Sequence, residues 1–286
     1  MTLELDDRQR AMLQEMGVRV WMPGTAFALQ EGKPERPAAV IAVKAVRDTA
    51  PEAVTPRVPA PLSPLFAPSV AGAAPPAAGT TALDVGHLDW QALADAAATC
   101  QACGLCAGRK QSTLQAPAEA AQADWFFVGD PPDEDEDRLG QPFAEQAGAL
   151  LDNMLKAMGA RRGGTGASGA YATNIVKCRP PGARLPLADE LAQCAAYLQR
   201  ELALVRPKVI VAMGRFAIAQ LLGEHAEATA LPLGKQRGTV YRYQGIPVVV
   251  TYAPTVLLRA SADKAKAWAD LCLALDVRDG LHTGLN

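Results

Sequence analysis

Residues 125–132 read Trp-Phe-Phe-Val-Gly-Asp-Pro-Pro, four apolar residues that run straight into a polar loop. Such a short, continuous apolar run between turn signals is typical of a strand that is buried on both faces. The Gly-Asp-Pro-Pro sequence that follows it is typical of a turn. We therefore predict a buried strand whose carboxyl end opens onto a polar loop.

Short apolar segments alternate with helical ones along the rest of the chain. We predict further strands at residues 171–176, 208–213 and 246–251, and helices at 87–99, 148–158, 187–205, 215–222 and 261–275. Strands that alternate with helices predict an α/β fold of three layers, α/β/α, with a central, mostly parallel sheet. Sites in such folds lie beyond the carboxyl ends of the strands. The unusual polar sequences fall there, after Val128, around Asn174, after Met213 and after Thr251.

The first 82 residues differ in composition from the rest. Residues 5–16 suit one short amphipathic helix, and residues 40–46 suit a short strand. Between positions 51 and 80 the chain has eight Pro and eight Ala. Such a stretch buries too little apolar surface to fold and reads as a disordered, semi-stiff tether. We predict a peptide anchor at 1–32, a Pro/Ala-rich linker at 33–82 and a folded domain at 83–280.

Charge and cysteine content narrow the class of protein. The chain has 28 Lys and Arg against 30 Asp and Glu, a net charge of −2. This balance excludes a generally basic nucleic-acid-binding coat, so any DNA contact must use a local patch. No apolar run approaches about 18 residues, and the acidic start is unlike a secretory signal. We expect no membrane span and a cytoplasmic location in a bacterium.

Six cysteines in a chain without a leader favour metal or cluster ligation over disulfides. Cys100 and Cys103 form a pair that can place two thiolates on one centre. Cys178 follows a predicted strand, and Cys194 lies in a predicted helix. These four suit either a four-iron–four-sulfur cluster or a structural zinc. Cys106 extends the run and could be a spare ligand, whereas Cys272 is expected to be an ordinary buried residue.

From Cys100 onward the sequence resembles the iron–sulfur (family 4) uracil-DNA glycosylases. The resemblance lies in the cysteine pair followed by Leu105 and Arg109, in Val128 to Phe143, in Ala147 to Asp152 and in Thr173 to Pro181. It continues in Pro207 to Val211, in Arg237-Gly238 and in Thr251 to Arg259. The resemblance implies a uracil-DNA glycosylase fold, DNA as partner, and a four-iron–four-sulfur cluster on Cys100, Cys103, Cys178 and Cys194.

The resemblance also implies roles for individual side chains, because uracil must leave the DNA stack and enter a pocket. Phe143 matches the aromatic that stacks on the base, and Asn174 the amide that reads its edge. Asp130, Glu136 and Asp137 are candidates for the catalytic carboxylate. Ala253 occupies the position beside the leaving base, and Leu257, Leu258 and Arg259 that of the wedge that fills the vacated space. Lys177, Arg179, Arg184 and Lys264 are candidates for phosphate contacts.

Simpler interpretations exist for several of these residues. A Phe after Pro142 is usually core, an Asn at a strand end is commonly a turn residue, and a Leu pair ordinarily packs a helix. The acidic run at 133–137 is usually a solvated loop, and binding of a divalent cation is an alternative.

Three positions depart from the family pattern. Asp130 stands for a Glu, Asp133 for a Gly, and Ala253 for a His that would donate a hydrogen bond to the leaving base. Losing one such donor typically costs about 100–1,000-fold in rate. The sequence therefore predicts hydrolysis of the N-glycosidic bond of a flipped uracil, with weak or altered activity.

A rival function comes from the N-terminal segment. Residues 13–21, with Ala28 to Gly32, resemble the N-terminal peptide of the psi subunit of bacterial DNA polymerase III, which binds the clamp loader. The resemblance implies a non-catalytic, glycosylase-fold subunit of the replication machinery that binds clamp-loader proteins through residues 5–32. A Trp on a flexible tether suits such an anchor. A terminal helix packed on its own domain is the simpler interpretation.

Overall fold

A computed structural model describes residues 84–117, 122–223 and 231–281. The predicted anchor at 1–32 and linker at 33–82, including the segments at 5–16 and 40–46, lie outside the described residues. None of the helices described is long and apolar enough to cross a lipid bilayer.

The centre of the domain is a six-stranded sheet in the order β2-β3-β1-β4-β6-β5. Its strands are β1 (Ala123–Gly129), β2 (Arg161–Arg162), β3 (Gly166–Asn174), β4 (Val209–Met213), β5 (Val240–Tyr243) and β6 (Ile246–Thr251). All neighbouring pairs are parallel except β5 and β6, which are antiparallel. Every residue of β1 is buried, as expected of a strand covered on both faces.

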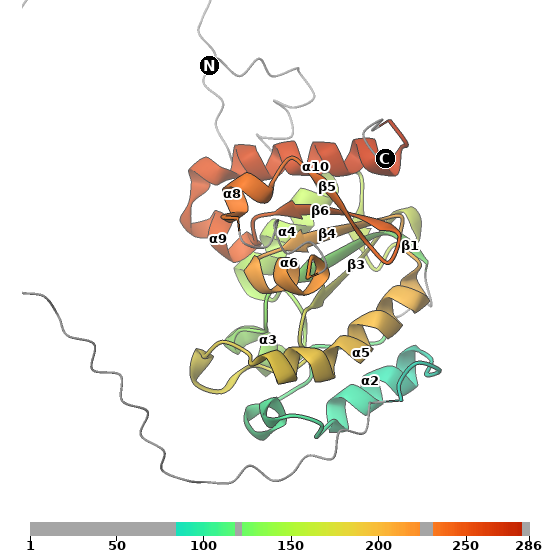
Figure 1. The fold of residues 1–286 in the computed structure, drawn as a ribbon, viewed down its shortest axis with the longest axis vertical. Coiled ribbons are helices and arrows are strands. Elements are labelled where there is room, and N and C mark those ends of the chain that lie inside the picture. Colours follow the sequence, from blue (N-terminus) through green and yellow to red (C-terminus); the bar gives the residue numbers. More distant parts are fainter. Residues whose placement is uncertain (1–83, 118–121, 224–230, 282–286) are drawn as a thin grey trace, which may run out of the picture. The chain divides into compact units, whose positions relative to one another are not determined.

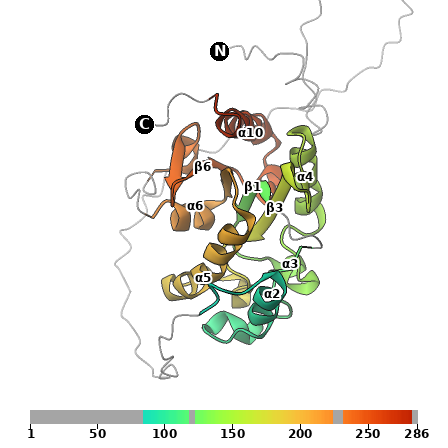
Figure 2. The same ribbon diagram turned by 90° about the vertical axis from the view of Figure 1, so that its right-hand side faces the viewer.

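Helices cover both faces of this sheet. Figures 1 and 2 show α10 on one side of the sheet and α5, with α2 outside it, on the other. The helices of the described residues are α2 (Trp90–Thr99), α3 (Glu134–Leu139), α4 (Glu145–Ala157), α5 (Ala188–Val205), α6 (Arg215–Leu221), α8 (Leu233–Gln236), α9 (Pro254–Arg259) and α10 (Lys264–Arg278), with short 3-10 turns η1 (Gly104–Gly108), η2 (Pro181–Ala183) and η3 (Ser261–Asp263).

Alternate residues of β1 serve two separate cores. Trp125 and Phe127 pack with α4, α9 and α10, whereas Phe126 and Val128 pack with α2, α5 and α6. The period-2 geometry of a strand produces this division, since successive side chains point to opposite faces. The predicted three-layer α/β/α fold is confirmed.

The main differences from the predicted elements lie at the sheet edges and in the acidic run. The edge strands β2 and β5 were not predicted, because their residues are only partly buried and carry Arg and Tyr. The acidic segment is not a solvated loop but helix α3, in which Glu136 and Asp137 are buried. Asp133 caps this helix and forms a capping box with Glu136, which stabilises the short helix.

Candidate functional site

Four parallel strands bring polar or special residues to one edge of the sheet. Gly129 at the end of β1 is the register partner of Asn174 at the end of β3. Asp130 follows β1, Gly214 follows β4, and Ala253 lies just beyond β6. Since β3, β1, β4 and β6 are neighbours, their carboxyl ends form one continuous edge. The strand order therefore brings together the polar segments that the sequence analysis placed after these strands.

The amide of Asn174 is held in one orientation. Its Nδ2 donates to the carbonyl of Asp130 and to Oε1 of Glu136, each at 3.1 Å. Its Oδ1 is buried and has no hydrogen-bond partner among the described residues. Both amide hydrogens are thus engaged, and the atom of this side chain that can still form a hydrogen bond is the acceptor Oδ1. A buried polar atom without a partner is costly in a native protein, so this oxygen is suited to accept from an ordered water or from a bound ligand.

Glu136 joins the amide to the aromatic residue of the site. Besides the bond from Asn174, its carboxylate accepts from the backbone N–H of Asp133 at 2.8 Å and of Phe143 at 2.5 Å. Burial raises the pKa of Glu136, and the hydrogen bonds from Asp133, Asn174 and Phe143 oppose that rise. Glu136 therefore ties helix α3, the Phe143 loop and the amide into one unit.

Phe143 is fixed by its backbone and by the glycines around it. Its φ is +53°, a left-handed conformation that costs free energy for a Phe. Arg162 donates to its carbonyl at 3.2 Å. The ring tip lies against Gly129, where an added Cβ would be 2.4 Å from Cζ, and the carbonyl lies against Gly148, where a Cβ would be 2.0 Å away. Phe143 is only 6% exposed and Asn174 only 2%, so both side chains are closed off from solvent in this conformation.

The other two candidate carboxylates bind backbone N–H groups. Asp130 Oδ1 accepts from the N–H of Phe216 at 2.9 Å, in the first turn of α6. Gly214 makes room for it, since a Cβ there would lie 2.2 Å from Asp130 Oδ2. Burial raises the pKa of Asp130, and the amides of α6 lower it. Asp137 is buried and accepts from the N–H of Lys110 at 3.0 Å.

The segment after β6 corrects one predicted role. Leu257 is fully buried in the core between α4 and α10, so it cannot act as a wedge. Leu258 is 44% exposed, and Arg259 is exposed as well. Ala253 is buried and caps α9 without a side-chain hydrogen bond. Because successive side chains of a helix point in different directions, α9 turns Leu257 into the core and Leu258 toward solvent.

A second correction concerns Lys177, predicted to contact phosphate. Its side chain is 2% exposed and pairs with Glu201, Nζ to Oε2, at 2.6 Å. It cannot reach a DNA backbone. Of the other basic candidates, Arg179 lies 3.4 Å from Glu134 and Arg184 forms a bidentate pair with Glu190. Lys264, at the start of α10, is partly buried.

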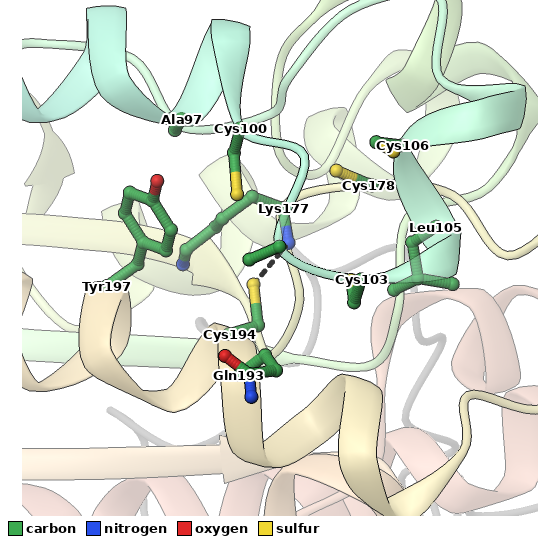
Figure 3. Close-up of a pocket in the computed structure, with 11 residues that line it drawn as sticks. Ala97, Cys100, Cys103, Leu105, Cys106, Lys177, Cys178, Gln193, Cys194 and Tyr197 are labelled. Carbon is green, nitrogen blue, oxygen red and sulfur yellow. Dashed lines mark hydrogen bonds between the residues drawn. The ribbon is translucent and has the colours of Figure 1, made fainter. Parts of the chain in front are cut away.

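Five cysteines line one cavity, shown in Figure 3. They come from the end of α2, from η1, from the loop after β3 and from α5, and they are Cys100, Cys103, Cys106, Cys178 and Cys194. In Figure 3 the sulfur atoms of Cys100, Cys178 and Cys194 turn toward a common space. The predicted convergence of Cys178 and Cys194 with the Cys100–Cys103 pair is therefore observed.

Hydrogen-bond donors and burial set the state of these thiols. Arg109 Nη1 lies 3.2 Å from Cys178 Sγ, and the backbone N–H of Lys177 lies 3.3 Å from Cys194 Sγ. Burial raises the pKa of Cys103 and Cys178, and that of Cys194 to about 12. A metal that bound such thiols would have to displace their protons. In the described part of the chain, no three His, Cys, Asp or Glu side chains converge closely enough to hold a single metal ion.

Sequence reasoning missed the partners that hold this site together. Glu201 is fully buried beside Lys177, and Arg162 pins the Phe143 loop through its bonds to Asp152 and to backbone carbonyls. The capping-box spacing of Asp133 and Glu136 was visible in the sequence and could have revealed α3. The pairing of Lys177 with Glu201 spans 24 residues and left no local signal.

The described residues form a three-layer α/β protein with polar residues at the strand ends and a cavity lined by cysteines. The sequence model of the Uracil DNA glycosylase superfamily matches residues 117–272, more than half of the chain, and the chain belongs to that superfamily.

Within the superfamily the similar proteins include Type-4 uracil-DNA glycosylases. The protein of that name from Pyrobaculum aerophilum is 34% identical over 194 residues, which are 65% of this chain and 93% of the relative. The one from Archaeoglobus fulgidus is 35% identical over 173 residues, 59% of this chain and 84% of the relative. A Type-5 uracil-DNA glycosylase from Pyrobaculum aerophilum is 37% identical over 87 residues, 30% of this chain and 37% of the relative.

Proposed function

We propose that this protein is a DNA-repair enzyme, a DNA N-glycosylase that hydrolyses the bond between uracil and deoxyribose in DNA. The observation that carries the proposal is the buried, unpartnered Oδ1 of Asn174 at the carboxyl edge of the sheet. The names of the Type-4 relatives support the same reaction.

Base selection follows from the orientation of the Asn174 amide. Because both Nδ2 hydrogens are engaged, the side chain offers an acceptor, which suits the ring N–H of uracil. Cytosine has an acceptor nitrogen at the same ring position, so two acceptors would face each other without a proton between them. The unpaired, buried oxygen then disfavours cytosine, as it does any base that lacks a donor there.

Entry of the base requires a local rearrangement. The flipped uracil stacks on Phe143, whose ring is buried against Gly129, so the ring or its neighbours shift as the base enters. Leu258 and Arg259, exposed at the end of α9, fill the space that the base leaves in the duplex. Arg179 and Arg184 contact phosphates after giving up their carboxylate partners.

Bond cleavage leaves negative charge on the departing uracil and positive charge on the sugar. The carboxylate of Asp130 lies at the strand ends and stabilises the sugar cation electrostatically. Glu136 acts on Asn174 and Phe143 rather than on the sugar, and Asp137 serves the loop at Lys110. The side chain of Ala253 has no donor for the leaving base, so the reaction is slower than it would be with one.

The cysteine cavity fits a four-iron–four-sulfur cluster. Cys100, Cys103, Cys178 and Cys194 would hold it, and N–H donors from Arg109 and Lys177 already face two of these sulfurs. A zinc ion needs its sulfurs about 2.3 Å from one point, hence about 3.8 Å apart. Zinc is the alternative occupant of the same thiolates, and the test of the cluster below distinguishes the two. By holding such a cluster, these cysteines would link α2, the loop after β3 and α5.

The test is a gel assay on an oligonucleotide that contains one uracil. We expect abasic-site formation by the full-length, iron-loaded protein, reduced by about 100-fold or more in Asn174→Ala. The matched control is Gln115→Ala, a change of a similar amide side chain that donates to the carbonyl of Gly140. A protein that forms no abasic sites, or an Asn174→Ala variant as active as wild type, contradicts the proposal.

The cluster has its own test. Broad absorbance near about 400 nm, expected of an iron–sulfur centre, should disappear in Cys194→Ala and persist in Cys272→Ala. Colourless protein that contains zinc contradicts the assignment.

A further inference from the structure

Lys177 and Glu201 form an ion pair inside the domain, and its polar atoms are engaged. Lys177 Nζ donates to Glu201 Oε2 at 2.6 Å, to the hydroxyl of Thr173 at 2.7 Å and to the carbonyl of Asn174 at 2.8 Å. Glu201 Oε1 accepts from the hydroxyls of Tyr171 and Thr173 at 2.9 Å each. Removing two charges from water costs several kcal/mol per ion, so a buried pair is weak evidence of a contribution to stability.

The pair lies between the cysteine cavity and the base-reading amide. Cys194 and Glu201 are both on α5, seven residues or about two turns apart, and so share one face of the helix. Lys177 contacts both of them, through its backbone N–H and through its ammonium. The same ammonium binds the main-chain carbonyl of Asn174. Helix α5 thus fixes the segment from Asn174 to Cys178 at two points.

We propose that Lys177, neutralised by Glu201, is a positioning residue that sets the main chain of Asn174 and thereby the acceptor that reads the base. The proposal rests on the proposed function and deepens it. Without the ammonium, the Asn174 carbonyl would lose its donor at 2.8 Å, and the hydroxyl of Thr173, 3.5 Å away, already donates to Glu201. The segment would then relax, and Asn174 Oδ1 would lose its fixed direction.

The informative variant is the double change Lys177→Met/Glu201→Gln. It keeps the volume of both side chains and removes both charges, and the Gln oxygen can still accept from Tyr171 and Thr173. A single change would leave one buried charge unpaired and risk unfolding. The matched control is Lys208→Met/Asp124→Asn, an ion pair at 2.9 Å that lies at the amino ends of β1 and β4, away from the strand-end site.

The first readout is discrimination in binding, measured on full-length protein of equal iron content. It is the ratio of dissociation constants for two duplexes, one with cytosine, which presents an acceptor to Asn174 Oδ1, and one with a fluorinated deoxyuridine that resists hydrolysis. We expect the pair variant to lower this ratio by about tenfold in the wild-type background and by less than about twofold in an Asn174→Ala background. The control variant should leave the ratio unchanged. Equal losses in both backgrounds mean that the pair acts on the whole fold, which overturns the proposal.

The second readout needs no activity. The N–H of Ile175 donates to the carbonyl of Gly129 at 2.9 Å, and that of Lys177 faces Cys194. We expect hydrogen exchange at these two amides to speed up by about tenfold in the pair variant, while amides in β4 keep their rates. Unchanged exchange overturns the proposal. If wild-type protein neither binds nor excises uracil, the proposed function falls, and amide exchange alone decides whether the pair fixes this segment.

Discussion

The contact between Gly129 and Phe143 gives a prediction whose size can be worked out. In Gly129→Ala the new Cβ would lie 2.4 Å from Cζ and 2.8 Å from Cε1 of the ring, well inside van der Waals contact. The ring can move away only at a cost in free energy, because Phe143 is buried and its carbonyl is held by Arg162 and abuts Gly148. Overpacking of this kind costs about 1–3 kcal/mol. At roughly 2–4 °C per kcal/mol for a domain of this size, the melting temperature should fall by several degrees.

Thermal unfolding and single-turnover uracil excision together measure the effect. We expect Gly129→Ala to lower both the melting temperature and the excision rate, because the displaced ring is the proposed stacking platform. Gly86→Ala is the control, since nothing lies within 4 Å of a Cβ at Gly86. The change Phe143→Leu shortens the obstructing side chain, so Gly129→Ala should cost much less stability in that background. A Gly129→Ala protein as stable and active as wild type, or a loss of equal size in the Phe143→Leu background, refutes the reasoning.

Three further predictions address titration, the wedge and the cysteines. Burial raises the pKa of Glu136, so the contribution of this group to stability is full below its unfolded pKa and is lost as the pH rises through its folded pKa. Denaturant unfolding should therefore show that the stability of Glu136→Gln depends less on pH over that window than the stability of the wild type. A pH dependence parallel to that of the wild type contradicts the shift. Leu257→Ala should lower the free energy of unfolding by about 2–5 kcal/mol, because the side chain is fully buried. Leu258→Ala should change it by less than about 0.5 kcal/mol, and should slow uracil excision from duplex DNA more than from single-stranded DNA. Equal slowing on both substrates argues against a wedge. Cys106→Ser should keep its iron, and Cys194→Ser should lose it, as measured by iron content per chain; iron loss in Cys106→Ser would make Cys106 a ligand.

The sequence predicts the parts of this fold that rest on continuous apolar segments. The strands at 125–128 and 246–251 are predictable because burial on both faces of a sheet requires a continuous run of apolar residues, and most residues of both strands are buried. Helix α3 was missed because five acidic residues in a row are normally solvated, and only tertiary packing places Glu136 and Asp137 inside. The prediction that Lys177 contacts phosphate was wrong for the same reason, because its buried partner Glu201 lies on α5, another element.

The site shows a similar division. The cysteine set was predictable because the chemistry of thiols limits their uses, and spacing identified the pair at Cys100 and Cys103. The separation of Leu257 from Leu258 was not predictable, since a one-residue change in the phase of a six-residue helix reverses which side chain is buried. Sequence patterns identify which residues gather at a strand end, but the hydrogen bonds that consume their polar atoms come from the fold.

The use of those hydrogen bonds bears on how the proposed reaction is accelerated. Each of the three candidate carboxylates accepts from at least one backbone N–H: Asp130 from α6, Glu136 from the α3 cap and the Phe143 loop, and Asp137 from the loop at 110. A carboxylate held by N–H donors is a charge of set position, and for Asp130 the amides of α6 oppose the rise in pKa that burial causes. Such groups suit electrostatic stabilisation of a sugar cation, which requires no proton transfer. The rate should therefore depend on the position of Asp130 more than on its basicity, so that Asp130→Glu and Asp130→Asn both impair excision, the first by displacing the charge and the second by removing it.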